Sequence, residues 1–337
     1  MSLSSTTCLL VLLTAFSSSL VAAEEPAAET EAKTDVWVTS LAHGKDDARF
    51  AGTATGLLLN PADVVRWTGD DFASRTTVMT HPAAVWCVSV CDHGGYVASA
   101  DYRGNLQTFD VAAGKATMHE GVFERWTQSM RFAPTGETIV AGNEAGKLFV
   151  FDSGKVTKTI DVDKNAITDI AFNAAANKIA VSDGGGRVHF YSWPELVDAG
   201  KVVIGDEPAW SVRFYTTSDT VLVGSGDRRL YRSEAKADAK PEVVMYGTDW
   251  ITRLAISDAG TIAVGEIGGS VYVLPNDTPH TESVAPVGKA SSGVWSLDWV
   301  TPSELVIGTR KDGIMTLRQS WAFTPTLTTT QTKADDE

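Results

Sequence analysis

Short apolar runs recur along almost the whole chain, and turns rich in glycine, proline and charged residues separate them. The unit 122–163 shows the pattern most clearly. Its apolar runs lie at 126–132, 138–142, 147–152 and 156–160, and a Pro-Thr-Gly turn follows the first of them. Runs of this length between such turns predict four short strands that form one antiparallel sheet.

Six of these runs begin at a tryptophan, namely Trp37, Trp86, Trp126, Trp210, Trp250 and Trp295. Neighbouring members lie 40, 45 or 49 residues apart, except for one gap of 84 residues between Trp126 and Trp210. That gap contains a matching run in which Ala166 takes the place of the tryptophan. A period of about 40 to 50 residues is typical of repeat architectures, so we expect one large repeat domain.

The same order of runs divides residues 35–329 into seven units, of which the first is the least regular. The units are expected at about 35–80, 81–121, 122–163, 164–206, 207–247, 248–288 and 289–329. In the first unit, we expect the third strand at 57–59 and the fourth near 76–80. Residues 321–329 are expected to form the outer strand of the last unit, because an unpaired sheet edge would otherwise remain there.

Two units carry the residues of a known repeat. In the unit 122–163 these are Phe132-Ala133-Pro134-Thr135-Gly136, then Ile139-Val140-Ala141-Gly142, then Phe151-Asp152 with Gly154-Lys155; the unit before it has Phe109-Asp110 with Gly114-Lys115. Over about 35–320 the chain resembles the WD-repeat family. The resemblance implies an all-β fold, a seven-bladed β-propeller of four-stranded antiparallel blades. Six or eight blades stay open because the first unit is irregular.

The chain departs from the family's usual pattern. No Trp-Asp dipeptide occurs, and no Gly-His opens a repeat. The sequence therefore gives no support for the network of histidine and aspartate side chains that the family typically carries.

The formal charge of the chain is −14 and its pI is about 4.9. A nucleic-acid backbone is therefore not an expected partner, since it requires a basic surface. Much of the excess lies in the acidic segments 24–34 and 330–337, which we expect to be disordered.

Residues 1–23 differ in composition from the rest. The apolar stretch 8–16 is followed by small residues, with Val21 and Ala23 before a cut at Glu24. This order predicts a secretory signal peptide, hence a secreted or periplasmic protein with no stable membrane span after cleavage. No Lys or Arg precedes the apolar stretch, which leaves an uncleaved anchor or a mis-assigned start as alternatives.

The tryptophans are the main candidates for a binding site. The resemblance implies that the first strand of each blade lines a central channel and that its start lies at the channel mouth, beside the turns between second and third strands. The partner-binding candidates are Trp37, Trp86, Trp126, Trp210, Trp250, Trp295, Tyr102, Arg103, Glu144, Arg228 and Arg310. Because Ala166 interrupts the series, we expect an asymmetric mouth and look for a ligand site beside that gap.

An alternative interpretation assigns the tryptophans to packing between blades. Each stands an even number of residues before apolar positions of its own strand, as Trp126 does before Met130 and Phe132. Even offsets in a strand place side chains on one face. The two interpretations are compatible, because the edge of an aromatic ring can stay exposed while its body is buried.

Motifs for catalysis or cofactor binding are not found in the sequence. It has no Gly-x-Ser-x-Gly elbow and no phosphate-binding loop, and its six histidines, at 43, 81, 93, 119, 189 and 280, lack metal-ligand spacing. We therefore expect no catalytic residues, no metal and no cofactor. Cys87 and Cys91 lie four residues apart in one predicted strand, too far apart for a disulfide, and are expected to be free.

These observations favour a non-enzymatic, extracytoplasmic scaffold. Its expected partner is a protein or peptide that binds at the channel mouth, and the protein is expected to be monomeric on its own. The alternative is a propeller enzyme of the lactonase or hydrolase type, or one with a non-covalent redox cofactor, with its site in the channel. Asp35, Asp169 and Asp298 lie in or beside first strands and are the candidates to bind Ca²⁺ in that case.

Overall fold

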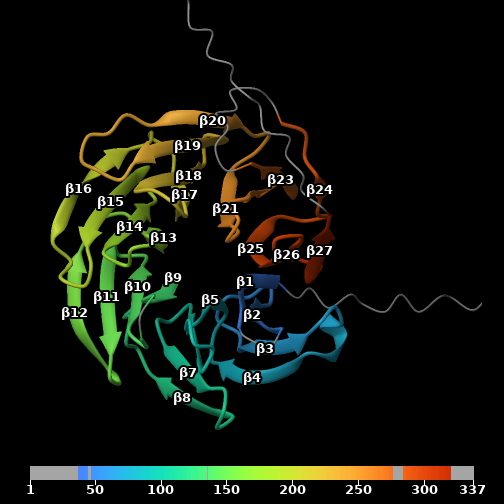
Figure 1. Cartoon of the computed structure of the whole chain (residues 1–337). Helices are drawn as coiled ribbons and strands as arrows, with labels where there is room; N and C mark the ends of the chain where they lie inside the picture. Colours follow the sequence, from blue (N-terminus) through green and yellow to red (C-terminus); the bar gives the residue numbers. More distant parts are fainter. Residues whose placement is uncertain (1–36, 45–46, 135, 276–283, 320–337) are drawn as a thin grey trace, which may run out of the picture. The chain divides into compact units, whose positions relative to one another are not determined.

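Seven antiparallel sheets follow one another around a central channel (Figure 1). The computed structural model describes residues 37–44, 47–134, 136–275 and 284–319, all within the compact unit 35–337. Each sheet is one blade, and its strands run in chain order from the channel outwards. The predicted all-β, seven-bladed propeller is confirmed.

The innermost strands are β1 (Trp37–His43), β5 (Val85–Val90), β9 (Thr127–Phe132), β13 (Ile167–Phe172), β17 (Ala209–Phe214), β21 (Ile251–Ile256) and β25 (Val294–Thr301). The second strands are β2 (Ala48–Ala54), β6 (Tyr96–Asp101), β10 (Ile139–Asn143), β14 (Lys178–Asp183), β18 (Thr220–Ser225), β22 (Ile262–Glu266) and β26 (Glu304–Thr309). These two strands of each blade pair antiparallel and hold most of the buried core.

The third strands are β3 (Ala62–Thr68), β7 (Leu106–Asp110), β11 (Lys147–Asp152), β15 (Arg187–Ser192), β19 (Arg229–Glu234), β23 (Ser270–Leu274) and β27 (Ile314–Arg318). The outer strands are β4 (Thr76–His81), β8 (Lys115–His119), β12 (Lys155–Asp161), β16 (Asp198–Val203), β20 (Glu242–Tyr246) and β24 (Gly288–Lys289). One short 3-10 helix, η1 (Phe72–Ser74), precedes β4. Within the described ranges blade seven has three strands.

Several predictions lie outside the described residues. They are the signal peptide 1–23, the acidic linker 24–34, Asp35, the outer strand at 321–329 and the acidic tail 330–337. They stay predictions.

One predicted strand of blade one is wrong. Residues 57–59 form a turn, and the third strand is β3, Ala62–Thr68. Val64 and Trp67 are buried in β3, whereas Leu57 and Leu59 are 66% and 58% exposed. The apolar run of leucines resembled a strand, but the segment that buries its side chains begins only after Pro61.

Every inner strand has a β-bulge near its start, at which two of its residues oppose one residue of the second strand. The extra residues are Thr39, Trp86, Gln128, Thr168, Trp210, Thr252 and Trp295. A bulge redirects side chains. The strict alternation on which the even-offset argument relied is therefore interrupted in every blade.

Neighbouring blades approach closely along their inner halves. Gly265 in β22 faces blade seven, where a Cβ added to it would lie 2.5 Å from Cγ1 of Val294. Threonines at the bulges also join blades: the hydroxyl of Thr39 donates to the carbonyl of Val85 at 2.6 Å, and that of Thr252 to the carbonyl of Val294 at 3.0 Å. Small residues and short hydrogen bonds thus fix the spacing between blades.

The ring closes where blade seven meets blade one, as β1 packs beside β25 and β26. Ion pairs join the two blades at this closure. Arg49 of β2, which is buried, lies 2.9 Å from a carboxylate oxygen of Glu304 and 3.0 Å from one of Asp47. Arg318 of β27 pairs with the same Glu304 at 2.9 Å.

A histidine network of the kind that the sequence did not support joins the end of β4 in blade one to β6 in blade two. His81 is fully buried between Ser99, at 2.7 Å, and Asp101, at 3.3 Å. Blade four has a different pair, in which His189 of the third strand lies 2.9 Å from Asp183. The missing Gly-His dipeptide hid the first network, because His81 is preceded by threonine at the end of an outer strand.

Candidate functional site

All six repeat tryptophans gather at one end of the channel, where the inner strands begin. Five of them, Trp86, Trp126, Trp210, Trp250 and Trp295, line a cavity of about 180 Å³, called here the mouth cavity. Gln128, Thr252, Arg253, Ile267 and Val294 complete its lining. Trp37 lies beside it, with its ring centroid 5.2 Å from that of Trp295.

The tryptophans occupy two alternative positions of the inner strand. Trp86, Trp210 and Trp295 are themselves the bulge residues. Trp37, Trp126 and Trp250 stand two residues before the bulge, which in their blades carries a smaller or polar side chain, namely Thr39, Gln128 and Thr252. One large aromatic side chain per blade thus reaches the mouth from either position.

The rings form two groups. Trp86 stacks on Trp295 and also contacts Trp126, with centroid distances of 5.0 Å in both pairs. Trp210 and Trp250 stack on each other at 6.1 Å. Blade four, which has Ala166 in place of a tryptophan, separates Trp126 from Trp210. The predicted asymmetry of the mouth is present, although Ala166 does not line the cavity.

Five of these indoles bury an N–H group that has no hydrogen-bond partner: those of Trp37, Trp86, Trp126, Trp210 and Trp295. Buried polar groups in proteins are nearly always satisfied by protein, water or ligand. Trp250 differs, because 46% of it is exposed. The mouth cavity therefore offers mainly apolar surface, since these five N–H groups are themselves buried.

The predicted rim residues are brought together only in part. The ring of Tyr102 lies 5.3 Å from that of Trp126, and the guanidinium of Arg310 lies 5.1 Å from the ring of Trp37. Glu144 borders the mouth, since its backbone N–H donates to the carbonyl of Trp126 at 2.9 Å. Arg103 and Arg228 are exposed on turns.

Sequence reasoning missed the exposed leucines of blade one. Leu58 packs against the cluster that contains Trp37 and Trp86, and its neighbours Leu57 and Leu59 face solvent. Exposed large apolar side chains beside a cavity often mark an interaction surface. Their signal in the sequence was the apolar run 57–59, which resembled a strand.

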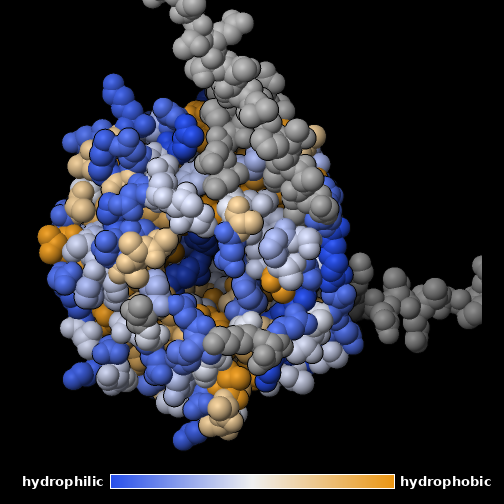
Figure 2. Space-filling model, in the orientation of Figure 1, coloured by the Kyte–Doolittle hydropathy of each residue, from blue (hydrophilic) through white to orange (hydrophobic). Residues whose placement is uncertain are grey.

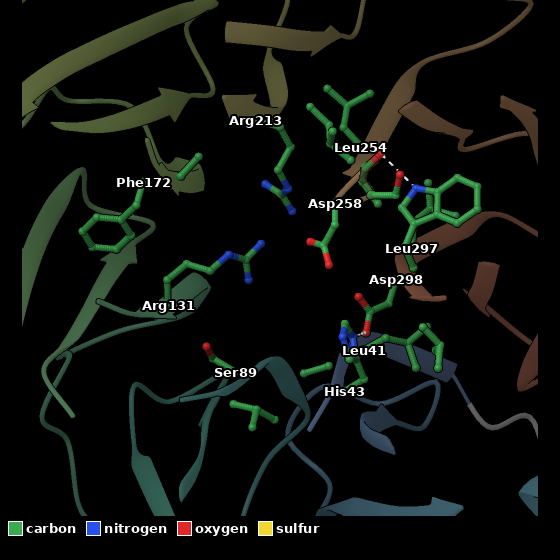
Figure 3. Close-up of a pocket in the computed structure, with 18 of the residues that line it drawn as sticks. Leu41, His43, Ser89, Arg131, Phe172, Arg213, Leu254, Asp258, Leu297 and Asp298 are labelled. Carbon is green, nitrogen blue, oxygen red and sulfur yellow. Dashed lines mark hydrogen bonds and ion pairs between the residues drawn. The ribbon is translucent and has the colours of Figure 1, made fainter. Parts of the chain in front are cut away.

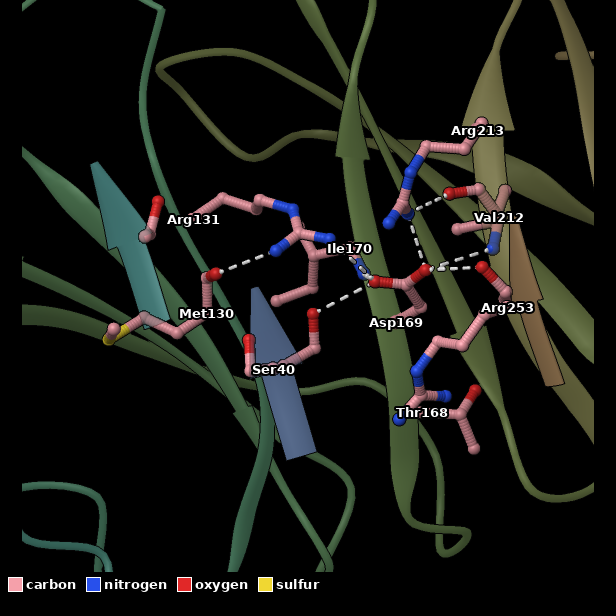
Figure 4. A network of polar contacts seen from close by, with 12 residues as sticks. Ser40, Met130, Arg131, Thr168, Asp169, Ile170, Val212, Arg213 and Arg253 are labelled. Atoms are coloured by element: carbon pink, nitrogen blue, oxygen red, sulfur yellow. Dashed lines mark hydrogen bonds and ion pairs between the residues drawn. The ribbon is translucent and has the colours of Figure 1, made fainter. Parts of the chain in front are cut away.

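Below the mouth cavity the channel narrows to a space of about 50 Å³, called here the neck. Its charged residues are Arg131, Asp169, Arg213 and Arg253 (Figure 4). One Asp169 carboxylate oxygen accepts from Ser129 at 3.1 Å and from Arg131 at 3.4 Å. The other accepts from the Ser211 hydroxyl at 2.8 Å and from Arg213.

Arginine charges determine the ionisation of Asp169. Burial by itself would raise the pKa of this carboxyl group, but Arg213 and Arg131 outweigh burial and hold its pKa at about 2. From the sequence, Asp169 was a candidate only as a calcium ligand. Its oxygens are instead occupied by arginine, serine and backbone donors.

These four residues are separated by 38, 44 and 40 positions along the chain. Asp169 and Arg253 directly follow their bulges, a position that is serine or cysteine in every other blade: Ser40, Cys87, Ser129, Ser211 and Ser296. A charge among small residues at one repeat position was thus a signal that an alignment of the units would have shown.

The channel opens at its other end into the lower pocket, of about 510 Å³ (Figure 3). Arg131 and Arg213 reach into it from one side, and Asp258 and Asp298 face them from the other. Nδ1 of His43 lies 2.8 Å from Asp298, and this hydrogen bond raises the pKa of His43. In the space-filling view, a hollow with strongly hydrophilic residues lies at the centre of the ring (Figure 2).

Neither the possible cation-binding cluster nor the two described cysteines has the features of a reactive site. Asp163, Asp183 and His189 lie close enough together to hold an ion, but Asp183 and His189 already pair with each other and Asp183 caps its turn. Cys87 and Cys91 are free and buried, and burial raises the pKa of Cys87 to about 12. A thiol with such a pKa is not a nucleophile at neutral pH.

Comparisons with known proteins agree with the architecture. The family described as WD domain, G-beta repeat matches residues 73–110, which include β4 to β7. Over 268 residues, or 77% of this chain, the sequence is 23% identical to E3 ubiquitin-protein ligase COP1 of Arabidopsis thaliana, of which the match covers 39%. The same-named protein of Pisum sativum is 23% identical over 199 residues, 57% of this chain and 30% of that protein.

The chain thus spans well under half the length of these curated relatives. The ligase activity in their names belongs to those proteins and is not assigned to this chain. In the described ranges, no helix has the length and apolar character needed to cross a membrane. The matched repeat and the seven blades of antiparallel strands show a β-propeller that is similar to the WD-repeat proteins, in a degenerate form.

Proposed function

We propose that this protein is a non-enzymatic interaction scaffold that binds a peptide segment of a partner protein at the tryptophan-lined mouth. The observation that carries the proposal is the mouth cavity itself, with five tryptophans around about 180 Å³ and exposed apolar side chains beside it. WD-repeat propellers bind protein partners. Binding of a protein partner is therefore the simplest function to propose for this fold.

The composition of the mouth supports a protein or peptide partner. Tryptophan dominates the binding energy of protein interfaces, because it buries a large rigid surface. Leu57, Leu59 and Trp250 extend the apolar surface from the cavity onto the rim. Arg310 and Glu144 add charge of both signs around this centre, and a polar rim around an apolar core is the usual anatomy of an interface.

Trp250 offers the cleanest test, because it is the most exposed of the six and its loss should spare the fold. Trp250→Ala is expected to weaken partner binding by at least about 30-fold, the effect of a hot spot of about 2 kcal/mol. Affinity capture from the source organism, with crosslinking and quantitative mass spectrometry, would identify partners whose recovery falls in this variant.

The matched control is Val203→Ala, which removes an exposed apolar side chain from β16, an outer strand. It should leave the recovery of the same partners unchanged. Trp126→Ala provides a second mouth variant, and near-ultraviolet circular dichroism checks the fold of each. Partners that both Trp250→Ala and Val203→Ala retain would contradict binding at the mouth.

We further propose that the scaffold acts outside the cytoplasm, as a monomer. Support for export comes from the sequence of residues 1–23 alone. Mass spectrometry of the protein purified from its source should find an N-terminus at Glu24. A chain that retains its first 23 residues would contradict export by cleavage and favour the uncleaved anchor or the mis-assigned start.

A further inference from the structure

Three spaces follow one another along the channel. The mouth cavity and the neck share Trp86, Gln128 and Arg253 in their linings, so they adjoin. The neck and the lower pocket share Arg131 and Arg213. A ligand that enters between the tryptophans therefore meets Arg253 first and the other two arginines below it.

The charges of the neck do not balance. Three arginines and one aspartate line it, which gives a formal charge of +2. Arg131 and Arg213 both contact Asp169. Arg253 instead donates to two backbone carbonyls, that of Trp295 at 2.5 Å and that of Thr252 at 2.7 Å, and no described carboxylate lies within 4.0 Å of it.

Arg253 is partly buried in the channel wall. A guanidinium in such a place without a carboxylate is unusual, because its removal from water is unfavourable unless an opposite charge compensates it. Burial lowers the pKa of Arg253 to about 10, while Asp169 opposes this shift from a distance. The group stays protonated at neutral pH, so an uncompensated positive charge lies beneath the tryptophans. Arginine also presents a planar set of donors that matches a carboxylate.

The sizes of the two upper spaces fit different parts of one ligand. A dry cavity of about 150 Å³ suffices to hold a benzene ring, so the mouth cavity, at about 180 Å³, accepts one apolar side chain. The neck, at about 50 Å³, is comparable to one or two water molecules of about 30 Å³ each. A carboxylate fits there, and an aromatic ring does not.

We propose that the peptide bound at the mouth places an apolar side chain among the tryptophans and a carboxylate beside Arg253 in the neck. This inference rests on the proposed function, since it specifies the chemistry of the segment bound there. The carboxylate is either the C-terminus of the partner or an Asp or Glu side chain near the apolar residue. Both present the same group to Arg253.

The first experiment uses the full chain and a small probe. 4-Phenylbutyrate carries a phenyl ring and a carboxylate, and 4-phenylbutanamide is its neutral counterpart. Ligand-observed NMR titrations should show the acid binding at least tenfold more tightly than the amide. Equal affinity for the two would overturn the proposal, and this comparison depends on no variant that could fail to fold.

Variants then locate the preference. Arg253→Met should reduce the acid-to-amide ratio to about one, whereas Arg253→Lys, which keeps the charge, should retain most of it. Arg75→Met removes an exposed arginine near η1, outside the channel, and serves as the matched control with an unchanged ratio. An acid preference that survives in folded Arg253→Met would overturn the assignment to this residue.

Two peptides separate the sources of the carboxylate, and each is compared with its amidated or asparagine counterpart. The first is Ac-Gly-Gly-Leu-Phe with a free C-terminus; the second is Ac-Gly-Phe-Asp-Gly-Gly-NH₂. Whichever acidic peptide displaces 4-phenylbutyrate at least tenfold better than its neutral counterpart identifies the source. Failure of both peptides, with the small acid still bound, would mark a small-molecule site and overturn the proposal.

Partner capture distinguishes failure of this inference from failure of the proposed function. Partners lost in Trp250→Ala but retained in Arg253→Met would overturn the carboxylate while leaving the scaffold intact. Partners unaffected by either change would contradict binding at the mouth altogether. Loss in both, with Arg75→Met unchanged, is the expected result.

Discussion

The two ends of the channel are built from the same seven strands but have opposite chemistry. At the mouth, the starts of the strands present six tryptophans, five of which bury an N–H group without a hydrogen-bond partner. At the lower pocket, the ends of the same strands present Arg131, Arg213, Asp258 and Asp298. The repeat fixes the backbone of each blade and leaves the residues at both strand ends free to differ.

Asp169 provides the severest test, because its carboxylate lies between the two ends. Asp169→Asn would leave arginines uncompensated in the neck, which should lower the free energy of unfolding by about 3–5 kcal/mol and weaken both ends. Denaturant unfolding at pH 7 measures this change in the free energy of unfolding. Asp258→Asn, an exposed carboxylate of the lower pocket, is the control and should change stability by under about 1 kcal/mol.

The same carboxylate predicts an acid dependence. Its pKa in the folded protein, about 2, lies below the ordinary value of 3.8. The stabilisation is therefore present above the unfolded value of 3.8, is full only above about pH 5, and is lost as the pH falls through the folded value of about 2. Asp169→Asn should flatten the stability curve in that window. If Asp169→Asn lowers the free energy of unfolding no more than Asp258→Asn does, the neck arginines do not require the Asp169 carboxylate for stability.

Gly265 tests the framework that both ends share. Gly265→Ala would force Val294 of the next blade to move, at a cost of about 1–3 kcal/mol in the free energy of unfolding. Gly205→Ala is the control, since nothing lies within 4 Å of a Cβ added there. Thermal unfolding of the two variants should differ by several degrees. Equal melting temperatures would mean that the blades can separate without penalty.

His43 provides the smallest effect, which is confined to the lower pocket. Its pKa is raised by the hydrogen bond to Asp298, so the stabilisation is present below the unfolded value of 6.5 and is lost as the pH rises through the folded value. Because 44% of the His43 side chain is exposed, solvent limits the effect to under about 1 kcal/mol. Unfolding measurements between pH 5 and 9 should show it.

Asp298→Asn should abolish that dependence. Ligand binding at the mouth should not follow the titration of His43, because the neck separates the two ends. A mouth affinity that changes in step with His43 would show instead that the channel responds as one unit.

The repeat period and the apolar runs were sufficient to predict the propeller and its inner strands. They were insufficient for blade one, where three leucines formed a turn and the real strand interleaves Asp63 and Arg66 with its buried residues. The β-bulges could not be predicted either, because the sequence of a single strand does not show where an extra residue is inserted. They decide which side chains point into the mouth.

The polar network of the neck is the clearest example of what a linear reading misses. Within its own strand, each of Arg131, Asp169, Arg213 and Arg253 resembles an ordinary polar residue. Asp169 and Arg253 stand one residue after their bulges, and Arg131 and Arg213 stand three residues after theirs. These shared positions gain meaning only when the inner strands of different blades face one axis. Comparison of the units with one another would have found them.

The sequence by itself determined the repeat, the strand order within each blade and the placing of one large aromatic residue at the start of six inner strands, because each of these depends on neighbours along the chain. Closure of the ring decided the rest. It brought indoles from six blades together at the mouth, and it placed three arginines and one carboxylate in the neck. Such contacts join residues that only tertiary packing makes neighbours, and their charges act through space.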